Sequence, residues 1–144
     1  MTTELNTIAF KAQTHPRHRF QNLYGLLSDD LLYQSWGQLN KKAKPGIDGI
    51  TMPQYKANLS NNIQRVSEQL KQKCYRANDV KRTYILKSNG KQRPLGLPTV
   101  DDKLVQHSVS QILQSIWEQD FVRNSYGYRP NKSAHQAVHS LSLN

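Results

Sequence analysis

The stretch from Asn89 to Gln106, NGKQRPLGLPTVDDKLVQ, changes character half-way along. It begins as a basic segment rich in glycine and proline, and it ends in the amphipathic pattern of a helix. Before it, residues 80–87 (VKRTYILK) are rich in β-branched and aromatic residues, which favour strands. Asn89-Gly90 can adopt the positive φ of a tight turn. The sequence therefore predicts a β-hairpin, with strands over 80–87 and 92–97, followed by a helix over about residues 100–119.

The start of this helix carries a helix-capping pattern. Thr99 lies three residues before Asp102, which resembles a capping box with Asp in place of Glu. The pair Asp101-Asp102 also suits a helix start, where carboxylates compensate the positive end of the helix dipole. Adjacent residues of a helix point about 100° apart, which is unfavourable for holding one metal ion. We therefore predict a helix-start role for this pair, and the same for Asp29-Asp30.

Upstream of the hairpin, apolar residues recur at helical spacing. They predict helices over about residues 17–27 and 30–40, with the second capped near Ser28. The basic, glycine-containing stretch 41–50 predicts a loop, and Thr51 with Pro53 predicts the start of a third helix. The apolar stripe of that helix is Leu59, Ile63, Val66 and Leu70.

Asn131 is predicted to cap a last helix, and residues 1–18, which are polar and without a clear period, are predicted to be a flexible N-terminal segment. Together the elements predict an α+β, mostly helical fold, in which N-terminal helices accompany a basic β-hairpin packed on a long helix.

The composition favours a polyanionic partner. The net charge is +10 over 144 residues, and the isoelectric point is about 9.9, which points to nucleic acid ahead of a protein that is merely basic. The one cysteine, Cys74, excludes an internal disulfide framework. No signal peptide or membrane-spanning apolar run is apparent, so we expect a cytoplasmic protein without a membrane partner.

The positive charge is concentrated around the hairpin. Eight basic residues and one acidic residue, Asp79, lie between Lys71 and Arg93. Lys87 and Arg93, on adjacent strands, can direct two cations at one phosphate or triphosphate. The alternative is a solvated strand edge, which lysines protect from aggregation. Tyrosines among these cations suit either base stacking or the core, and they are Tyr75, Tyr84, Tyr126 and Tyr128.

Other catalytic patterns are weak. His135 and His139 stand four residues apart, as zinc ligands on a helix can, but the sequence lacks both the glutamate of an HExxH motif and a nearby cysteine. No Ser-His-Asp pattern, phosphate-binding loop or dinucleotide-binding fingerprint is apparent.

Three blocks, taken in order, resemble a known family. They are PGIDGIT from Pro45, YILKSNGKQRPLGLPTVDDKLVQ from Tyr84, and IWEQDFVRNSYGYRPNKSAHQAV from Ile116. The chain from about Arg19 onward is similar to the N-terminal part of group II intron-encoded reverse transcriptase/maturases. Two departures are that Leu86 stands where proline is usual and that Tyr128 stands where phenylalanine is commoner; neither removes a charge.

The resemblance implies a division of the chain and a set of binding residues. Residues 19–78 would be an N-terminal helical domain with a template-side loop, and residues 79–144 would be part of the fingers of a right-hand polymerase. Lys87 and Arg93 would hold the incoming nucleotide's triphosphate. Template or RNA contacts would come from Lys44, Gly46, Asp48, Gly49, Arg82, Lys91, Tyr126, Tyr128 and Arg129.

The family's metal-binding aspartates lie in later palm blocks, including a Tyr-Ala-Asp-Asp turn, and these 144 residues contain no such turn. We therefore expect a fragment that binds RNA and a nucleotide triphosphate but does not polymerise alone. The Mg²⁺ of the full-length family would be held elsewhere, so no cofactor and no catalytic residue is expected here. Further partners would be the missing palm and maturase parts. The alternative is a non-catalytic RNA-binding accessory protein that reuses this lobe.

Overall fold

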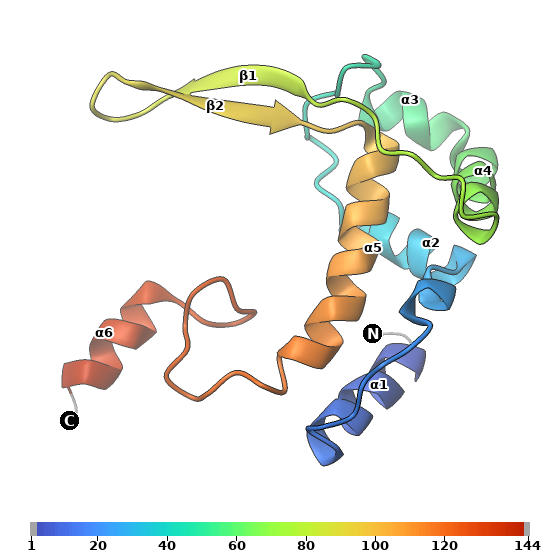
Figure 1. The fold of residues 1–144 in the computed structure, drawn as a ribbon. Helices are drawn as coiled ribbons and strands as arrows, with labels where there is room; N and C mark the ends of the chain where they lie inside the picture. Colours follow the sequence, from blue (N-terminus) through green and yellow to red (C-terminus); the bar gives the residue numbers. More distant parts are fainter. Residues whose placement is uncertain (1–2, 143–144) are drawn as a thin grey trace. The chain divides into compact units, whose positions relative to one another are not determined.

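The computed structural model describes residues 3–142 (Figure 1). The elements, in order, are α1 (Thr3–Thr14), a 3₁₀ helix η1 (Leu23–Leu26), α2 (Asp29–Gln38), α3 (Met52–Ala57), α4 (Leu59–Lys71), β1 (Lys81–Leu86), β2 (Gln92–Leu97), α5 (Val100–Trp117) and α6 (Ala134–Ser142). This architecture confirms the predicted α+β, mostly helical fold. Residues 21–110 form one compact unit, and the segments on either side of them in the chain form a second.

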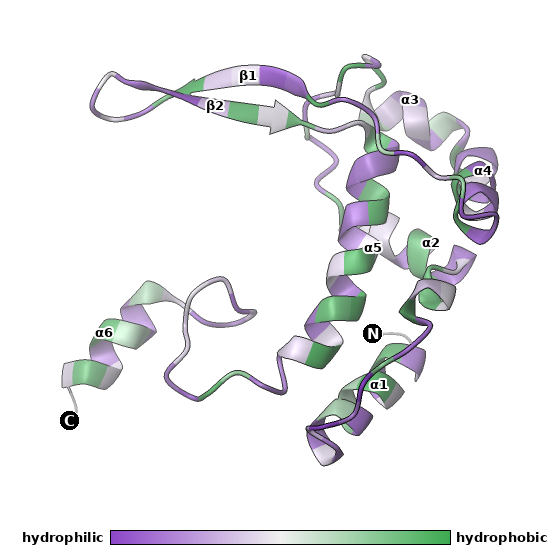
Figure 2. Cartoon of the chain, viewed as in Figure 1, coloured by the Kyte–Doolittle hydropathy of each residue, from purple (hydrophilic) through white to green (hydrophobic). Residues whose placement is uncertain are grey.

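The core of the 21–110 unit is built from α2, α3, α4 and the first turns of α5. Each helix buries one apolar side, and Figure 2 shows the green stripes alternating with purple, hydrophilic sides. From the predicted stripe of the third helix, Ile63, Val66 and Leu70 are buried. The other buried apolar residues of this core are Leu27, Leu31, Leu32, Trp36, Met52, Tyr55, Val100 and Leu104.

The helix starts follow the predicted capping chemistry. The Ser28 hydroxyl accepts a hydrogen bond from the Leu31 amide at 3.4 Å, which confirms the predicted cap of α2. Thr51 and Gln54 form a reciprocal capping box at the start of α3. The single helix predicted after Thr51 is interrupted at Asn58, which leaves the helical backbone with φ −121° and ψ 35°. Asparagine tolerates such a break because it is a weak helix former.

Two predicted helix boundaries are wrong. The helix expected over 17–27 is reduced to η1, and Asn22 before it adopts a left-handed φ of 56°. The last helix is capped by Ser133 and not by Asn131, because the Ser133 hydroxyl accepts from the Gln136 amide and the Gln136 side chain accepts from the Ser133 amide. Asn131 itself has a φ of 57° and lies in the preceding turn.

Helix α1 was not predicted at all. Its stripe, Leu5, Ile8, Ala9 and Ala12, does have helical spacing, but two of the four side chains are only methyl groups. Leu5 and Ala12 are nevertheless buried. No helix among residues 3–142 is long and apolar enough to cross a membrane.

The hairpin is confirmed with the predicted turn. β1 and β2 pair antiparallel, with Lys81 opposite Leu97 and Leu86 opposite Gln92. Gly90 takes a φ of 75° in the turn, where an L side chain would be strained. Pro98 and Thr99 then lead directly into α5, so the base of the hairpin is joined to the start of this helix (Figure 1).

Gly46 has no room for a side chain, because a Cβ atom there would lie 2.6 Å from the Thr99 nitrogen and 2.8 Å from the Pro98 carbonyl carbon. We expect Gly46→Ala to lower the free energy of unfolding by about 2 kcal/mol, because the loop must move away from rigid backbone. Urea denaturation followed by circular dichroism measures the change. The control is Gly37→Ala in α2, where nothing lies within 4 Å of the added methyl. An unchanged midpoint for the Gly46 variant would contradict this packing.

Candidate nucleic-acid interface

One face of the hairpin carries most of its cations. Because side chains alternate along a strand, Lys81, Thr83 and Ile85 share a face, and the register places Arg93 opposite Ile85 on that face. The Lys87 amide donates to the Lys91 carbonyl at 2.8 Å, which extends the pairing by one step and keeps both lysines on the same face. Diagonal neighbours in such a pair lie about 7–8 Å apart, within reach of one phosphate for long side chains.

These hairpin cations are exposed, and none of them forms an ion pair with a carboxylate in the described part of the chain. The three ion pairs among the described residues join Arg65 to Asp101, Lys71 to Asp29, and Arg129 to Glu118. Arg82 lies on the opposite hairpin face, together with Tyr84 and Leu86. Tyr84 is 57% exposed, so this ring does not enter the core.

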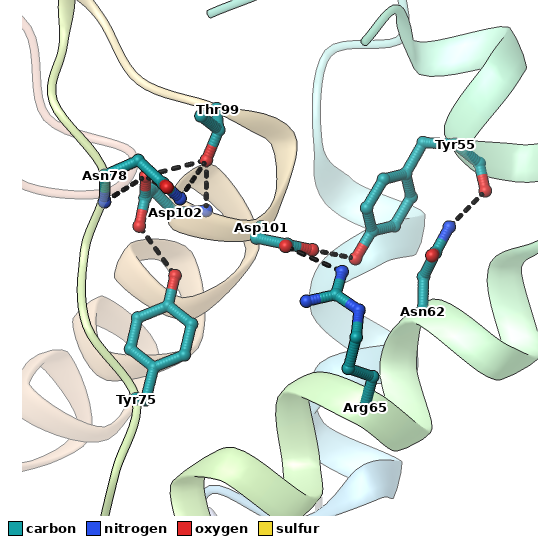
Figure 3. Close-up of polar contacts among 8 residues, drawn as sticks. All are labelled: Tyr55, Asn62, Arg65, Tyr75, Asn78, Thr99, Asp101 and Asp102. Atoms are coloured by element: carbon teal, nitrogen blue, oxygen red, sulfur yellow. Dashed lines mark hydrogen bonds and ion pairs between the residues drawn. The ribbon is translucent and has the colours of Figure 1, made fainter. Parts of the chain in front are cut away.

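The Asp101 carboxylate links α5 to the two preceding helices (Figure 3). The Tyr55 hydroxyl of α3 donates to its Oδ1 at 2.6 Å, and the Arg65 guanidinium of α4 donates to its Oδ2 at 2.7 Å. Burial, followed by the hydrogen bond to Asp101, raises the pKa of Tyr55, so this hydroxyl stays a donor. The Tyr55 ring also stacks on Trp36, with 5.4 Å between ring centroids.

The Asp102 carboxylate points the other way, toward the segment that leads into β1 (Figure 3). It accepts from the Tyr75 hydroxyl at 2.6 Å, from the Thr99 hydroxyl at 2.7 Å and from the Asn78 amide at 3.2 Å. Burial acts to raise the pKa of Asp102, but the hydrogen bonds outweigh it and the pKa is lowered. The predicted cap is also present, since the Asp102 amide donates to Thr99 at 3.3 Å.

The loop over residues 41–50 lies against the same helix start. Lys103 of α5 donates to the Lys44 carbonyl at 2.6 Å, and Gly46 packs against the backbone of Thr99. Asp48 accepts from the Ile50 amide at 3.2 Å, and Gly49 between them has a φ of 71°. Thus four of the predicted template-side positions, Lys44, Gly46, Asp48 and Gly49, are held beside the base of the hairpin.

The carboxylates at this helix start do not fit a magnesium site. Asp101 and Asp102 diverge to opposite sides of α5, and both oxygens of each already accept hydrogen bonds from protein groups. At Asp29 one oxygen, Oδ1, accepts from both Ser67 and Lys71. Both aspartate pairs lie in the first turn of a helix, as predicted, and Asp29, Asp101 and Asp102 also make tertiary contacts.

The remaining predicted residues belong to the second unit. Arg129 has a side chain only 9% exposed and bonds Glu118 at 2.6 Å, and its other donors reach the carbonyls of Val122 and Ser125. Lys132 lies over the Tyr126 ring, 5.6 Å from its centroid. Tyr128 is fully exposed and has a left-handed φ of 55°. Arg129 thus organises this loop from within, while Tyr128 is presented to solvent.

No family model matches the chain. It is 34% identical over 140 residues to protein YkfC of Escherichia coli K12, which covers 94% of this chain and 37% of YkfC. It is also 34% identical over 139 residues to the group II intron-encoded protein LtrA of Lactococcus lactis, covering 95% of the chain and 23% of LtrA. This chain is a homologue of group II intron-encoded proteins. A 91 kDa protein in the cob intron of Schizosaccharomyces pombe is 30% identical over 128 residues, which is 86% of the chain and 16% of that protein. This group II intron-encoded protein homologue thus corresponds to a part of its longer relatives.

Three residues that hold the two aspartates were not predicted from the sequence. They are Tyr55, Arg65 and Asn78. A signal was available for Tyr55, because a buried Tyr hydroxyl needs a hydrogen-bond partner. Pairing it with a particular aspartate required the fold.

The substitution Asp102→Asn tests the hydrogen-bond network around the Asp102 carboxylate of this chain. The side-chain amide of this variant has one acceptor oxygen where the carboxylate has two. One donor therefore loses its partner, and the free energy of unfolding should fall by about 1–3 kcal/mol at neutral pH. Since the folded pKa lies below the unfolded value of about 3.8, the stabilisation is complete above that value and is lost as pH falls through the folded pKa. The variant should therefore lose less stability than wild type on acidification below about pH 4.

Urea titrations at neutral and acid pH measure both effects. The control is Asp30→Asn, because Asp30 is exposed at the start of α2 and its change should stay within about 0.5 kcal/mol. Equal acid sensitivity of the Asp102 variant and wild type would show that the carboxylate is not stabilised as described.

Proposed function

We propose that this chain is the RNA- and nucleotide-binding part of a group II intron reverse transcriptase/maturase, and that its hairpin binds phosphates. The single observation that carries the proposal is the register, which gathers Lys87, Lys91 and Arg93 on one exposed hairpin face without an acidic partner among the described residues. A fork-shaped guanidinium beside two ammonium groups suits a triphosphate or successive backbone phosphates.

The support beneath the hairpin favours the same function. A binding group is effective when its position is fixed before the ligand arrives, because less conformational entropy is then lost on binding. Here both the segment entering β1 and the residues leaving β2 are fastened to Asp102, through Asn78 and Thr99. The loop over 41–50 rests on the same helix start, so the proposed template-side residues and the base of the phosphate-binding hairpin have one common support.

The salt dependence of RNA binding tests the proposal. For single-stranded RNA, the logarithm of affinity should fall with the logarithm of salt concentration, with a slope of about −0.7 for each phosphate contacted. We expect Lys87→Ala with Arg93→Ala to weaken binding and to reduce the slope by about 1.4, because two contacts are lost. Fluorescence anisotropy of a labelled RNA across a salt series gives both values.

The matched control removes the same charge elsewhere. Lys11→Ala with Arg19→Ala changes two exposed cations outside the hairpin, so it separates a local contact from the effect of net charge. Equal losses in the two double variants would overturn the assignment to the hairpin. A wild-type affinity that does not depend on salt would overturn phosphate binding itself.

We further propose that the 144 residues alone do not extend a primer. Two-metal nucleotidyl transfer needs carboxylates free to bind ions, whereas Asp29, Asp101 and Asp102 accept hydrogen bonds within the protein. A primer-extension assay with magnesium should show no product above a no-enzyme control. Template-dependent product from the purified chain that disappears on Asp101→Asn would show that these carboxylates have a catalytic role.

A further inference from the structure

A polar pocket lies beside the hairpin support, between the loop over 41–50 and helices α3 and α4. Its volume is about 370 Å³, near the lower end of the range for small-ligand pockets. It is lined by Asp48, Gly49, Ile50, Gln54, Tyr55, Asn58, Asn62, Arg65 and Asp101. Asp48 and Gly49 are predicted template-side residues, whereas the amides of α3 and α4 in this lining have no role assigned above.

Three amide side chains supply hydrogen-bonding groups that have no partner among residues 3–142. Gln54 employs its Oε1 in the helix cap, so its Nε2 keeps both donors. Asn62 donates through Nδ2 to the Tyr55 carbonyl at 3.1 Å, which leaves its Oδ1 as an acceptor (Figure 3). Asn58 makes no side-chain cap, and its amide is unpaired among the described residues. Donors and acceptors are therefore both present in the lining of the pocket.

The charges of the lining do not favour an anion. Asp101 and Arg65 pair with each other at 2.7 Å, and Asp48 remains as a second carboxylate, whose charge acts on Lys103. A phosphate inside the pocket would face at least as much negative as positive charge. The chain around the pocket is basic by contrast, with Lys44 in the loop and Lys56 in α3. A neutral, hydrogen-bonding group that belongs to a polyanion suits both a lining that disfavours an anion and the basic residues around it.

We propose that this pocket holds one unpaired nucleobase of a bound RNA strand. The edge of a base presents a donor and an acceptor side by side, which the free Nε2 of Gln54 and the side-chain amide of Asn58 can meet, with Oδ1 of Asn62 as a further acceptor. Ile50 supplies an apolar contact for the base. The neighbouring lysines neutralise the flanking phosphates, so the base enters while the backbone stays on the rim. The inference rests on the proposed RNA binding and deepens it.

The test uses the 144-residue chain and two labelled RNA strands of about ten nucleotides, a typical single-strand site size. One is unstructured and contains all four bases, and the other has the same backbone with every base removed. The pocket variant is Gln54→Glu with Asn58→Ala. Glutamate keeps the cap acceptor but removes the Nε2 donors, and Asn58 makes no side-chain hydrogen bond that alanine would lose.

Wild type should bind the base-bearing strand about five- to tenfold more tightly than the abasic strand, as expected for one or two hydrogen bonds. The pocket variant should lose this preference and keep the slope of affinity against salt. The control, Gln64→Glu with Asn61→Ala, makes the same substitutions at exposed positions of α4 and should keep the preference. Asn58→Ala alone should lose about half of it on a logarithmic scale.

The possible failures are distinguishable. If wild type binds both strands equally, with affinity falling as salt rises, the nucleobase pocket is wrong and the proposed phosphate binding stands. If the pocket variant keeps the wild-type preference, bases are read elsewhere and the assignment to this pocket is overturned. If neither strand binds, the proposed RNA binding is wrong, and the nucleobase pocket, which rests on it, is wrong as well.

Discussion

The 21–110 unit depends on two carboxylates at the first turn of α5. Taking the charged Asp102 side chain out of water is unfavourable unless protein donors replace the lost hydration. Tyr75, Thr99 and Asn78 supply those donors. Asp101 does the same on the opposite side with Tyr55 and Arg65. Three stretches of chain that are distant in sequence, in α3, in α4 and before β1, thus meet at one helix start, because each contributes a donor that the carboxylates need.

This use of the acidic residues has a consequence for the basic ones. The chain has 10 acidic and 20 basic residues, and three of the acids, Asp29, Asp101 and Asp102, serve as hydrogen-bond acceptors within the helical unit. None of the ion pairs within residues 3–142 involves a hairpin cation, so the hairpin keeps its charge available for an external partner. Two regions of the surface therefore differ in their chemistry. The hairpin tip carries positive charge, while the pocket beside its support carries side-chain amides. A nucleic-acid strand carries the complement of both, in its phosphates and in its bases.

Local chemistry made much of the fold predictable. Asn89-Gly90, between a β-branched run and a proline-containing return strand, specified the hairpin, and Ser28 and Thr51 specified two helix starts. The α1 stripe was missed because alanine methyls give a weak hydrophobic signal, and the break at Asn58 was missed because the apolar stripe runs through it. The single cationic face was predictable only in part, since it follows from the register as well as from the residues.

The long-range contacts were beyond the sequence. Nothing in Asp101 or Asp102 alone indicates a tyrosine partner 46 or 27 residues away. Gly46 looked like a loop glycine, whereas its role is a close approach to the backbone of Thr99. The pocket is lined by residues from both sides of the break at Asn58, and because that break was not foreseen, the amides of α3 and α4 could not be assigned to a common pocket.

The central claim is that the cationic face of the hairpin is where RNA meets this chain. Its most direct measurement is a nuclear magnetic resonance titration of the isotope-labelled chain with a short single-stranded RNA at low salt. The account predicts that the largest shifts fall on the side-chain nitrogens of Lys87, Lys91 and Arg93 and on the backbone amides between them. Shifts that leave these groups unchanged and appear on other parts of the chain would contradict it.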